Sequence, residues 1–297
     1  MDFVLTLVGS NRPISAGHIA LLEKFFEDEG LLMIEEPTWL NPHKAVDLFL
    51  AECPNLEQMT KLRDIISEDR IDVFCTNAHA RKKSLLLADM DSTIVTSETL
   101  DELAEEANLK DKISGITARA MRGELDFHAA LKERVGLLKG LSTDALNRTL
   151  EKTEISKGAD IVVKTMRAHG AFCVLVSGGF TFFTSAIAKQ LTFTQHHGNI
   201  LNIEDGVLTG TVSEPILDSQ AKLRFLNLYC EELEIDIEET VAIGDGANDL
   251  PMLKSAALGV GYHPKPLLKE ELINYIEFTD LTSLLYAQGY HSDNFVQ

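Results

Sequence analysis

Hydrophobic and polar residues alternate in short runs over the first 80 residues, and the period of the pattern changes several times. Residues 3–8 alternate with a period of two, as a half-buried strand does, whereas residues 16–28 have the apolar spacing of an amphipathic helix. The same criteria predict strands at 31–36, 45–50 and 71–75 and a second helix at 56–67. The resulting order, βαββαβ, predicts a small α+β, ferredoxin-like domain over residues 1–80.

A different pattern begins after the polar and basic segment 76–83, which we expect to be a linker. Short apolar runs now end in loops that carry polar residues, at Asp89, Ser177 and Asp245, and a helical pattern follows each loop. This alternation predicts parallel βα units in an open, Rossmann-like α/β sheet. Ligands bind beyond the carboxyl ends of the strands in such sheets, which is where all three loops fall.

The stretch 95–155, between the first and second of these strands, is too long for a simple crossover. Its apolar spacing predicts helices at 99–107, 113–122, 126–135 and 143–152, which would lie over the strand ends as a cap. A β-hairpin is predicted at 202–212, with Asp205-Gly206 at its turn. We therefore expect a second domain at 81–297, in which a core (84–94 and 156–290) carries the cap (95–155).

Charge and composition remove several classes of function. The formal net charge of −19 argues against nucleic acid as a partner, because a phosphate backbone needs a basic face. Four scattered cysteines form no ligand-like cluster, so we expect reduced thiols and a cytoplasmic protein. Neither a basic, apolar leader nor an apolar stretch of the ~18 residues that span a bilayer is evident, so we expect no membrane partner.

Two carboxylates, Asp89 and Asp91, follow directly on a buried strand and can reach one site if the chain curls there. Asp89 would then attack phosphorus as a nucleophile, which divides a difficult hydrolysis into two easier steps. Asp91 would donate a proton to the leaving oxygen and later take one from water. An Asp-x-Asp also occurs by chance in polar loops, so this interpretation depends on the residues that accompany the pair.

The loop Ser177-Gly178-Gly179 places a hydroxyl and two residues without side chains at a strand-to-helix turn. Backbone N–H groups in such a turn can approach a phosphate closely, although an ordinary glycine turn would have the same sequence. Lys222, in a predicted helix at 219–229, would offset the charge of the transferring phosphoryl group.

The loop 244–249 offers oxygen ligands on a chain loosened by glycine. Such a loop suits Mg²⁺, which prefers carboxylates, waters and substrate phosphate in near-octahedral geometry. Asp89 and Asp245 would be the ligands, with Asp249 behind them as a hydrogen-bond acceptor.

Nucleophile, acid/base, hydroxyl with glycines, lysine and carboxylate loop occur in this order at strand ends, and the set resembles the four motifs of the haloacid dehalogenase superfamily of phosphatases. The resemblance covers residues 84–285 and implies Mg²⁺-dependent hydrolysis through an aspartyl-phosphate. It further implies that Asp91 binds Mg²⁺ through its backbone carbonyl. The family positions that contact the phosphate or lie beside it match Ser177, Gly178, Lys222 and Asn248.

The cap narrows this resemblance, because segments 95–98, 121–127, 131–135 and 137–141 look like the cap of phosphoserine phosphatases. That family implies that Glu98 faces the substrate ammonium and that Arg134 holds its carboxylate, for which a planar guanidinium is well suited. Met121 and Phe127 would close the site and exclude water. The implied reaction is hydrolysis of L-phosphoserine to L-serine and phosphate, the last step of L-serine biosynthesis. Glu98 and Arg134 could otherwise belong to an ordinary charged cap surface.

The N-terminal unit, with Gly9-Ser10-Asn11-Arg12-Pro13 after its first strand, resembles ACT-type regulatory domains. Such domains often bind amino acids and pair across subunits. The resemblance implies L-serine or another amino acid as an effector, and a homodimer formed through this unit. A module that only stabilises or dimerises the chain is the alternative.

Two other functions fit part of the pattern. A superfamily phosphatase or phosphotransferase that acts on another small phosphate, such as phosphohomoserine, would use the same motifs. A signalling receiver also combines clustered aspartates, a hydroxyl and a lysine, but it requires neither the acid/base at Asp91 nor a cap. The adjacent His196 and His197 have no evident carboxylate partner, so we expect them to be structural.

Overall fold

The computed structural model describes residues 2–121 and 124–297, except for the side chain of Met121. The N-terminal region (residues 2–80) is an antiparallel sheet with the strand order β2-β3-β1-β4 and two helices, which is the predicted ferredoxin-like arrangement. Its elements are β1 (Phe3–Gly9), α1 (Ala16–Glu29), β2 (Thr38–Asn41), β3 (Ala45–Leu50), α2 (Leu56–Ile65) and β4 (Ile71–Asn77).

The strand predicted at 31–36 is wrong, because the edge strand is β2, at Thr38–Asn41. Within 31–36 only Met33 forms a bridge, to Leu50 of β3. The following residue, Pro37, has no N–H to give to a ladder and separates the two segments. A tight connection at 42–44, in which His43 has a φ of 61°, instead pairs β2 with the start of β3.

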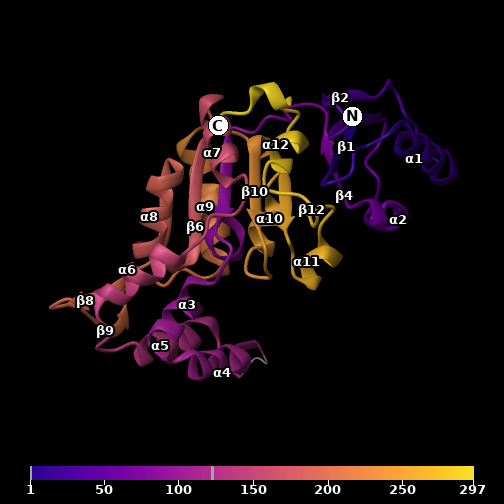
Figure 1. Ribbon diagram of the computed structural model, residues 1–297. Helices are drawn as coiled ribbons and strands as arrows, with labels where there is room; N and C mark the ends of the chain where they lie inside the picture. The colour runs from indigo at the N-terminus through magenta and orange to yellow at the C-terminus, as the bar shows by residue number, and fades with distance from the viewer. Residues whose placement is uncertain (1, 122–123) are drawn as a thin grey trace.

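Alternation along β1, β3 and β4 gives the N-terminal sheet two buried faces. Leu5 and Leu7 of β1 pack with Leu22 and Phe26 of α1, and Met59 and Leu62 of α2 belong to the same cluster. Val8 of β1 lies in a different cluster, together with side chains of the C-terminal segment. The region therefore has a core of its own and also packs against the rest of the chain (Figure 1).

A parallel sheet of six strands forms the centre of the remaining chain, in the order β12-β11-β10-β5-β6-β7. Its strands are β5 (Leu85–Asp89), β6 (Phe172–Phe180), β7 (Gln195–Asn199), β10 (Thr240–Gly244), β11 (Leu258–Tyr262) and β12 (Asn274–Ile276). β5, the first of these six strands along the chain, lies between β6 and β10, so the strand order reverses there. Ligands of open α/β sheets bind at such a reversal, beyond the carboxyl ends of the strands.

Helices cover both faces of this sheet, and the side chains of the central strands β5, β6 and β10 alternate between them. Leu86 and Ala88 of β5 belong to the cluster that contains α7, α8 and α12, whereas Leu85 and Leu87 belong to the cluster that contains α9, α10 and α11. The bounds of these helices are α7 (Ala159–Ala168), α8 (Thr181–Leu191), α9 (Ser219–Glu232), α10 (Leu250–Ser255), α11 (Pro266–Glu271) and α12 (Ser283–Ala287).

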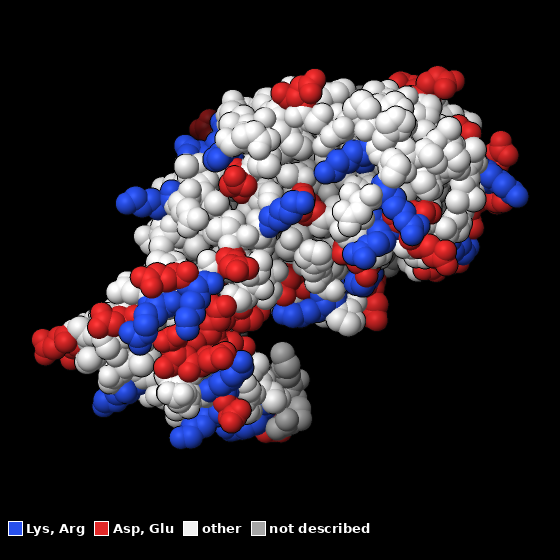
Figure 2. Space-filling model, viewed as in Figure 1, with Lys and Arg blue, Asp and Glu red and all other residues white. Residues whose placement is uncertain are grey.

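The insertion between β5 and β6 is helical, as the spacing predicts, and lies at the carboxyl ends of the strands (Figure 1). It contains α3 (Thr99–Glu106), α4 (Lys110–Met121), α5 (Phe127–Leu137) and α6 (Thr143–Lys152). The predicted hairpin is present as β8 (Leu201–Glu204) and β9 (Val207–Val212), and β9 packs against α5. Figure 2 shows a hollow between this protruding lobe and the main body.

Polar side chains join the N-terminal region to the edge of the parallel sheet. Asn274 of β12 bonds both the N–H and the carbonyl of Cys75 in β4, at 2.7 and 3.1 Å. Buried Asp72 accepts hydrogen bonds from the backbone N–H groups of residues 277–279. Arg81, in the segment expected to be a linker, donates to Asp47 at 2.6 Å and to the carbonyl of Tyr286 at 3.3 Å. That segment is therefore packed rather than extended in solvent.

Candidate active site

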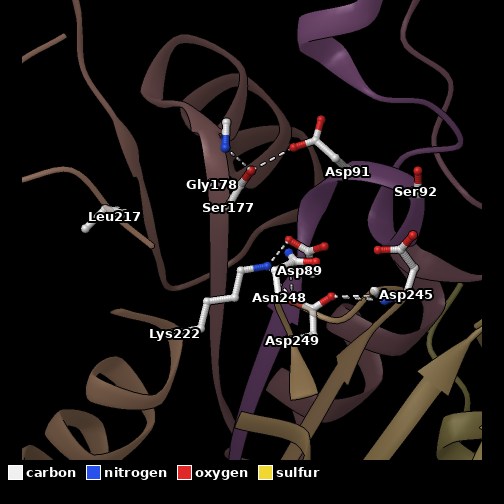
Figure 3. A network of polar contacts seen from close by, with 12 residues as sticks. Asp89, Asp91, Ser92, Ser177, Gly178, Leu217, Lys222, Asp245, Asn248 and Asp249 are labelled. Atoms are coloured by element: carbon white, nitrogen blue, oxygen red, sulfur yellow. Dashed lines mark hydrogen bonds and ion pairs between the residues drawn. The ribbon is translucent and has the colours of Figure 1, made fainter. Parts of the chain in front are cut away.

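Three strand ends meet at the reversal of the strand order. β5 ends at Asp89, β10 leads into Asp245, and Ser177 lies in the carboxyl half of β6. After Asp89 the chain curls through residues 90–94, and Ser92 adopts a left-handed conformation with a φ of 56°. This turn brings Asp91 to the same edge of the sheet, with its carboxylate directed toward Ser177 (Figure 3).

The carboxylates of Asp89, Asp245 and Asp249 form a buried group whose ligand atoms all lie within 4.8 Å of one another. Lys222 of α9 reaches this group with its ammonium, which lies 2.5 Å from an oxygen of Asp89 and 2.5 Å from an oxygen of Asp249. The lysine is 2% exposed, so its charge acts where solvent screens it little. A second ammonium, that of Lys265, lies 2.8 Å from Asp245. Two lysines do not balance three carboxylates, and a bound cation fits the remaining negative charge.

The electrostatics of this group follow from its burial. Burial raises the pKa of Asp89 well above its ordinary value, the carboxylate of Asp249 adds to the shift, and the Lys222 ammonium opposes it. Burial alone would lower the pKa of Lys222, but the carboxylates of Asp249 and Asp89 hold it above its ordinary value. Lys222 is therefore a permanent cation beside Asp89.

Asp249 is held by its own loop. One oxygen accepts from the backbone N–H groups of Asp245 and Gly246, at 3.2 and 3.1 Å, while the other bonds Lys222. Gly244 makes this fold-back possible, since a Cβ at this position would lie 2.4 Å from the Asp249 carboxyl carbon. Asp249 uses both oxygens in this way, whereas Asp89 and Asp245 each have one ammonium neighbour, Lys222 and Lys265. Asp89 and Asp245 are therefore the carboxylates that best suit a hard, oxygen-preferring cation.

Asp91 has a different set of partners from Asp89. One oxygen accepts from the backbone N–H and the hydroxyl of Thr99, at 2.9 and 2.7 Å, and the other accepts from the Ser177 hydroxyl at 2.7 Å. The Ser177 hydroxyl oxygen in turn accepts from the N–H of Gly179 at 2.7 Å. A Cβ at Gly179 would lie 2.9 Å from the Asp91 carboxylate oxygen, so a side chain there would displace this carboxylate from its position.

The predicted phosphate-contacting residues surround this group. Gly178 lies beside Ser177, and its carbonyl accepts from Asn199 at 2.8 Å. Asn248 is exposed on the loop after β10, with its amide 3.5 Å from Asp249 (Figure 3). The structure thus brings Asp89, Asp91, Ser177, Lys222 and the 245–249 loop to one place.

The predicted substrate residues come from the cap and the segment that leads into it. Glu98 accepts from the Ser92 hydroxyl at 2.9 Å. Its side chain is 49% exposed, but partial desolvation beside the cap, reinforced by the charge of Asp91, raises its pKa. Arg134 of α5 is half-buried, which lowers its pKa, while the negative charges of Asp101 and Glu98 act in the opposite direction. The Phe127 ring lies 3.5 Å from the position of a Cβ on Gly178, so the cap contacts the core there. The Met121 side chain lies outside the described residues.

Two residues of the site had not been predicted from the sequence. Thr99, at the start of α3, holds Asp91, but nothing in its sequence neighbourhood indicates this contact. Lys265 follows β11 and lies between two prolines, with its ammonium 2.8 Å from Asp245 and 3.9 Å from Glu98. Its position after a strand of the parallel sheet is the signal that could have identified it.

His196 and His197 have structural partners, as expected. His196 bonds the Thr184 hydroxyl at 3.0 Å, and His197 bonds the Tyr229 hydroxyl at 2.7 Å and stacks on Phe225. In the described part of the chain, no helix combines the length and apolar character needed to cross a membrane.

Comparisons with known proteins agree with this geometry. The model of the haloacid dehalogenase-like hydrolase family matches residues 86–254. A phosphoserine phosphatase of Lactococcus lactis is 39% identical over 203 residues, which cover 68% of this chain and 94% of the relative. A phosphoserine phosphatase of Archaeoglobus fulgidus is 41% identical over 204 residues, or 69% of this chain. The match spans 59% of the Archaeoglobus protein, and a similar match spans 53% of the one from Streptomyces coelicolor.

Solved structures extend the likeness to the whole chain. A haloacid dehalogenase family hydrolase from Salmonella enterica serovar Typhi superimposes with a TM-score of 0.84 at 28% identity, over 96% of this chain and 98% of that one. A phosphoserine phosphatase solved as a phospho-aspartyl intermediate analogue has a TM-score of 0.64 at 38% identity, over 69% of this chain and 98% of its own. This chain therefore belongs to the haloacid dehalogenase-like hydrolases and, within them, to the phosphoserine phosphatase family.

Proposed function

We propose that this protein hydrolyses L-phosphoserine to L-serine and phosphate, the last step of L-serine biosynthesis, through an aspartyl-phosphate on Asp89. The observation that carries the proposal is the division of the two aspartates between separate networks. Asp89 faces Lys222 and the acidic group, whereas Asp91 faces Thr99 and Ser177. A nucleophile and an acid/base need such different surroundings.

Mg²⁺ is the cation that this site would hold. Its ligands would be the carboxylates of Asp89 and Asp245 and the backbone carbonyl of Asp91, with substrate phosphate and water completing the set. When bound, the cation neutralises charge on the phosphoryl group and on the nucleophile.

Asp89 attacks the phosphorus, and a bond forms between its carboxylate oxygen and phosphorus as the bond to the serine oxygen breaks. The leaving oxygen takes a proton from Asp91, which the hydroxyls of Thr99 and Ser177 hold in place. Asp91 then takes a proton from water as the water oxygen attacks phosphorus. The bond to Asp89 breaks and phosphate leaves, so every proton is returned. Lys222 offsets the charge on the phosphoryl oxygens throughout.

Substrate selection belongs to the cap and the segment leading into it. Glu98 would hold the ammonium of phosphoserine and Arg134 its carboxylate. The negative charge of Glu98 already acts to raise the pKa of Arg134, against the effect of burial. Ser177, Gly178, Lys222 and Asn248 would contact the phosphate. Phe127, already against Gly178, would exclude water together with Met121. A pocket that binds both charges of an amino acid would discriminate against phosphates that lack them.

The N-terminal region would serve regulation or assembly. We propose L-serine or a related amino acid as its ligand and a homodimer formed through it. Both rest on its ferredoxin-like sheet and on its contacts with the edge of the parallel sheet. Calorimetric titration of the full chain with L-serine and its mass in solution test the two parts separately. The four free cysteines support a reducing, cytoplasmic location.

Phosphate release with Mg²⁺ from a panel of phosphorylated metabolites at equal concentration tests the substrate. The panel includes L-phosphoserine, phosphohomoserine, sugar phosphates and an artificial aryl phosphate. L-Phosphoserine is expected to have the highest kcat/KM. A higher value for phosphohomoserine or for a sugar phosphate would refute this substrate while leaving the phosphatase chemistry intact.

Arg134→Ala tests the recognition of the carboxylate. The variant is expected to lose far more kcat/KM with phosphoserine than with the aryl phosphate, because only phosphoserine presents a carboxylate to the guanidinium. Arg224→Ala, which removes an arginine exposed on α9, is the matched control and should leave both activities unchanged. Equal losses for the two substrates in Arg134→Ala would contradict the assignment.

A further inference from the structure

Two of the four cysteines face each other in the N-terminal region, remote in sequence from the catalytic motifs. Cys53 lies in the loop after β3, and Cys75 lies in β4. Their sulfur atoms are 2.6 Å apart, although both cysteines are free thiols. That separation is between the ~2.0 Å of a disulfide bond and the ~3.5–4.0 Å at which non-bonded heavy atoms ordinarily rest. A small movement would bring the sulfurs to bonding distance.

The four thiols differ in how readily they can react. Burial raises the pKa of Cys173, in β6, to about 12, and burial also raises the pKa of Cys230. The pKa of Cys53 is instead held below its ordinary value, because the Cys75 thiol can donate a hydrogen bond to the Cys53 thiolate. Cys53 is also partly exposed, whereas Cys75 is only 5% exposed. Thiolate character and access together make Cys53 the point at which oxidation would begin.

We propose that Cys53 and Cys75 form a reversible oxidation site that reacts with a small two-electron oxidant such as hydrogen peroxide and closes to a disulfide. The Cys53 thiolate attacks one peroxide oxygen, the O–O bond breaks, and water leaves after protonation, so that Cys53 becomes a sulfenic acid. The Cys75 sulfur then attacks the Cys53 sulfur, the S–O bond breaks, and a second water leaves with the Cys75 proton. Two electrons pass from the thiol pair to peroxide.

The position of Cys75 gives this bond a structural consequence. The backbone N–H and carbonyl of Cys75 are the groups that Asn274 of β12 bonds, at 2.7 and 3.1 Å. A disulfide would tie the loop after β3 to the strand that meets the parallel sheet, across a separation of 22 residues. Such a cross-link restricts the unfolded chain and stabilises the fold. No step proposed at Asp89 involves either cysteine, so this inference is independent of the proposed function.

The experiment treats the full chain with hydrogen peroxide, blocks the remaining thiols, and measures intact mass and non-reduced peptide masses. The expected result is a loss of about 2 Da, two thiols left to block, and a peptide pair joined through Cys53 and Cys75. A dithiol reductant should restore the original mass. Cys53→Ser and Cys75→Ser should each abolish the 2 Da loss, whereas Cys230→Ser, the matched control, should behave as the unaltered chain.

Thermal unfolding gives a second readout. Oxidation should raise the Tm of the unaltered chain and of Cys230→Ser, but not the Tm of Cys53→Ser or Cys75→Ser, once circular dichroism shows that both variants are folded. A disulfide that joins any other pair, a disulfide between two chains, or oxygen addition at Cys53 with Cys75 left as a free thiol would overturn the proposal.

Discussion

Asp89 and Asp91 are two residues apart in sequence but belong to different hydrogen-bond networks. The turn at 90–94 separates them, so that Asp89 meets Lys222 and Asp91 meets Thr99 and Ser177. Lys222 compensates the charge of Asp89, whereas hydroxyls and a backbone N–H orient Asp91. This arrangement suits the separate tasks that we propose for them, nucleophile and acid/base.

Asp91→Asn tests that division. The amide can still accept from Thr99 but cannot give or take the proton, so kcat should fall on the order of 10²–10⁴-fold. Asp205→Asn makes the same chemical change at the exposed turn between β8 and β9 and should leave kcat unchanged. Near-normal kcat in Asp91→Asn would remove the proton-transfer role from this residue.

The raised pKa of Glu98 leads us to expect that substrate binding depends on pH. Because partial desolvation and Asp91 raise its pKa, this carboxylate becomes neutral on acidification at a higher pH than an ordinary glutamate. If Glu98 holds the substrate ammonium as proposed, this attraction is present above that pKa and lost below it, so the KM for phosphoserine should rise as the pH falls. Glu98→Gln should show only the pH dependence of the phosphate itself. The same pH profile in both proteins would contradict the role of Glu98.

Among single residues, those that belong to a recognisable motif could be identified from the sequence. Residues that reach the site only because the chain folds could not. Asp89, Asp91, Ser177 and Asp245 follow from their residue types at strand ends, and Lys222, on helix α9, follows only from their company. The structure brings all five together. Thr99 and Lys265 are ordinary residue types, and only the folded chain brings them to Asp91 and Asp245.

Among the elements, the loop after β10 is the one on which the acidic group most depends. Gly244→Ala would place a Cβ 2.4 Å from the Asp249 carboxyl carbon, so Asp249 could no longer fold back onto the N–H groups of Asp245 and Gly246. Calorimetric titration should show at least a tenfold weaker affinity for Mg²⁺, as for other changes to groups that orient metal ligands.

Gly115→Ala is the matched control for that variant, because a Cβ at this position in α4 would meet nothing within 4 Å. It should bind Mg²⁺ as the unaltered chain does. Unchanged Mg²⁺ affinity in Gly244→Ala would show that the fold-back of Asp249 is unnecessary for the site.

Elements with a strong period were predictable, whereas an irregular edge was not. The helices of the cap and the hairpin are found within a few residues of their predicted bounds, and strands end at Asp89 and directly before Asp245 as expected. Residues 31–36 have the apolar content of a strand. The tight turn at 42–44, however, determines which residues pair with β3 at this edge of the sheet, and these are Thr38–Asn41. Pairing across an edge is a tertiary property and leaves little trace in local periodicity.

The whole molecule is joined by contacts between residues about 200 positions apart. Asp72 and Asn274 link the N-terminal sheet to the segment 273–279, and Arg81 links it to α12. The order of the two regions could be predicted, and the division at residue 80 stays a prediction. These contacts of Asp72, Asn274 and Arg81 form the joint between the two regions. The joint could not be predicted, because side-chain to backbone hydrogen bonds between residues so far apart in sequence have no sequence signature.

Asp72→Ala tests the strength of the joint. It leaves the N–H groups of residues 277–279 without their acceptor at a buried position, which should lower the free energy of unfolding by on the order of 3 kcal/mol. Asp64→Ala, on the exposed side of α2, is the control and should change stability little. Denaturant unfolding measures both, and equal midpoints would mean that the joint contributes nothing.

The most direct test of the account is rapid acid quenching of the full chain with Mg²⁺ and L-phosphoserine radiolabelled in the phosphate. Free L-serine should appear in a burst matched by label bound to protein, on a peptide that contains Asp89, and Asp89→Asn should remove both the burst and the bound label. Steady phosphate release with no label on the protein, or label on another residue, would contradict the account.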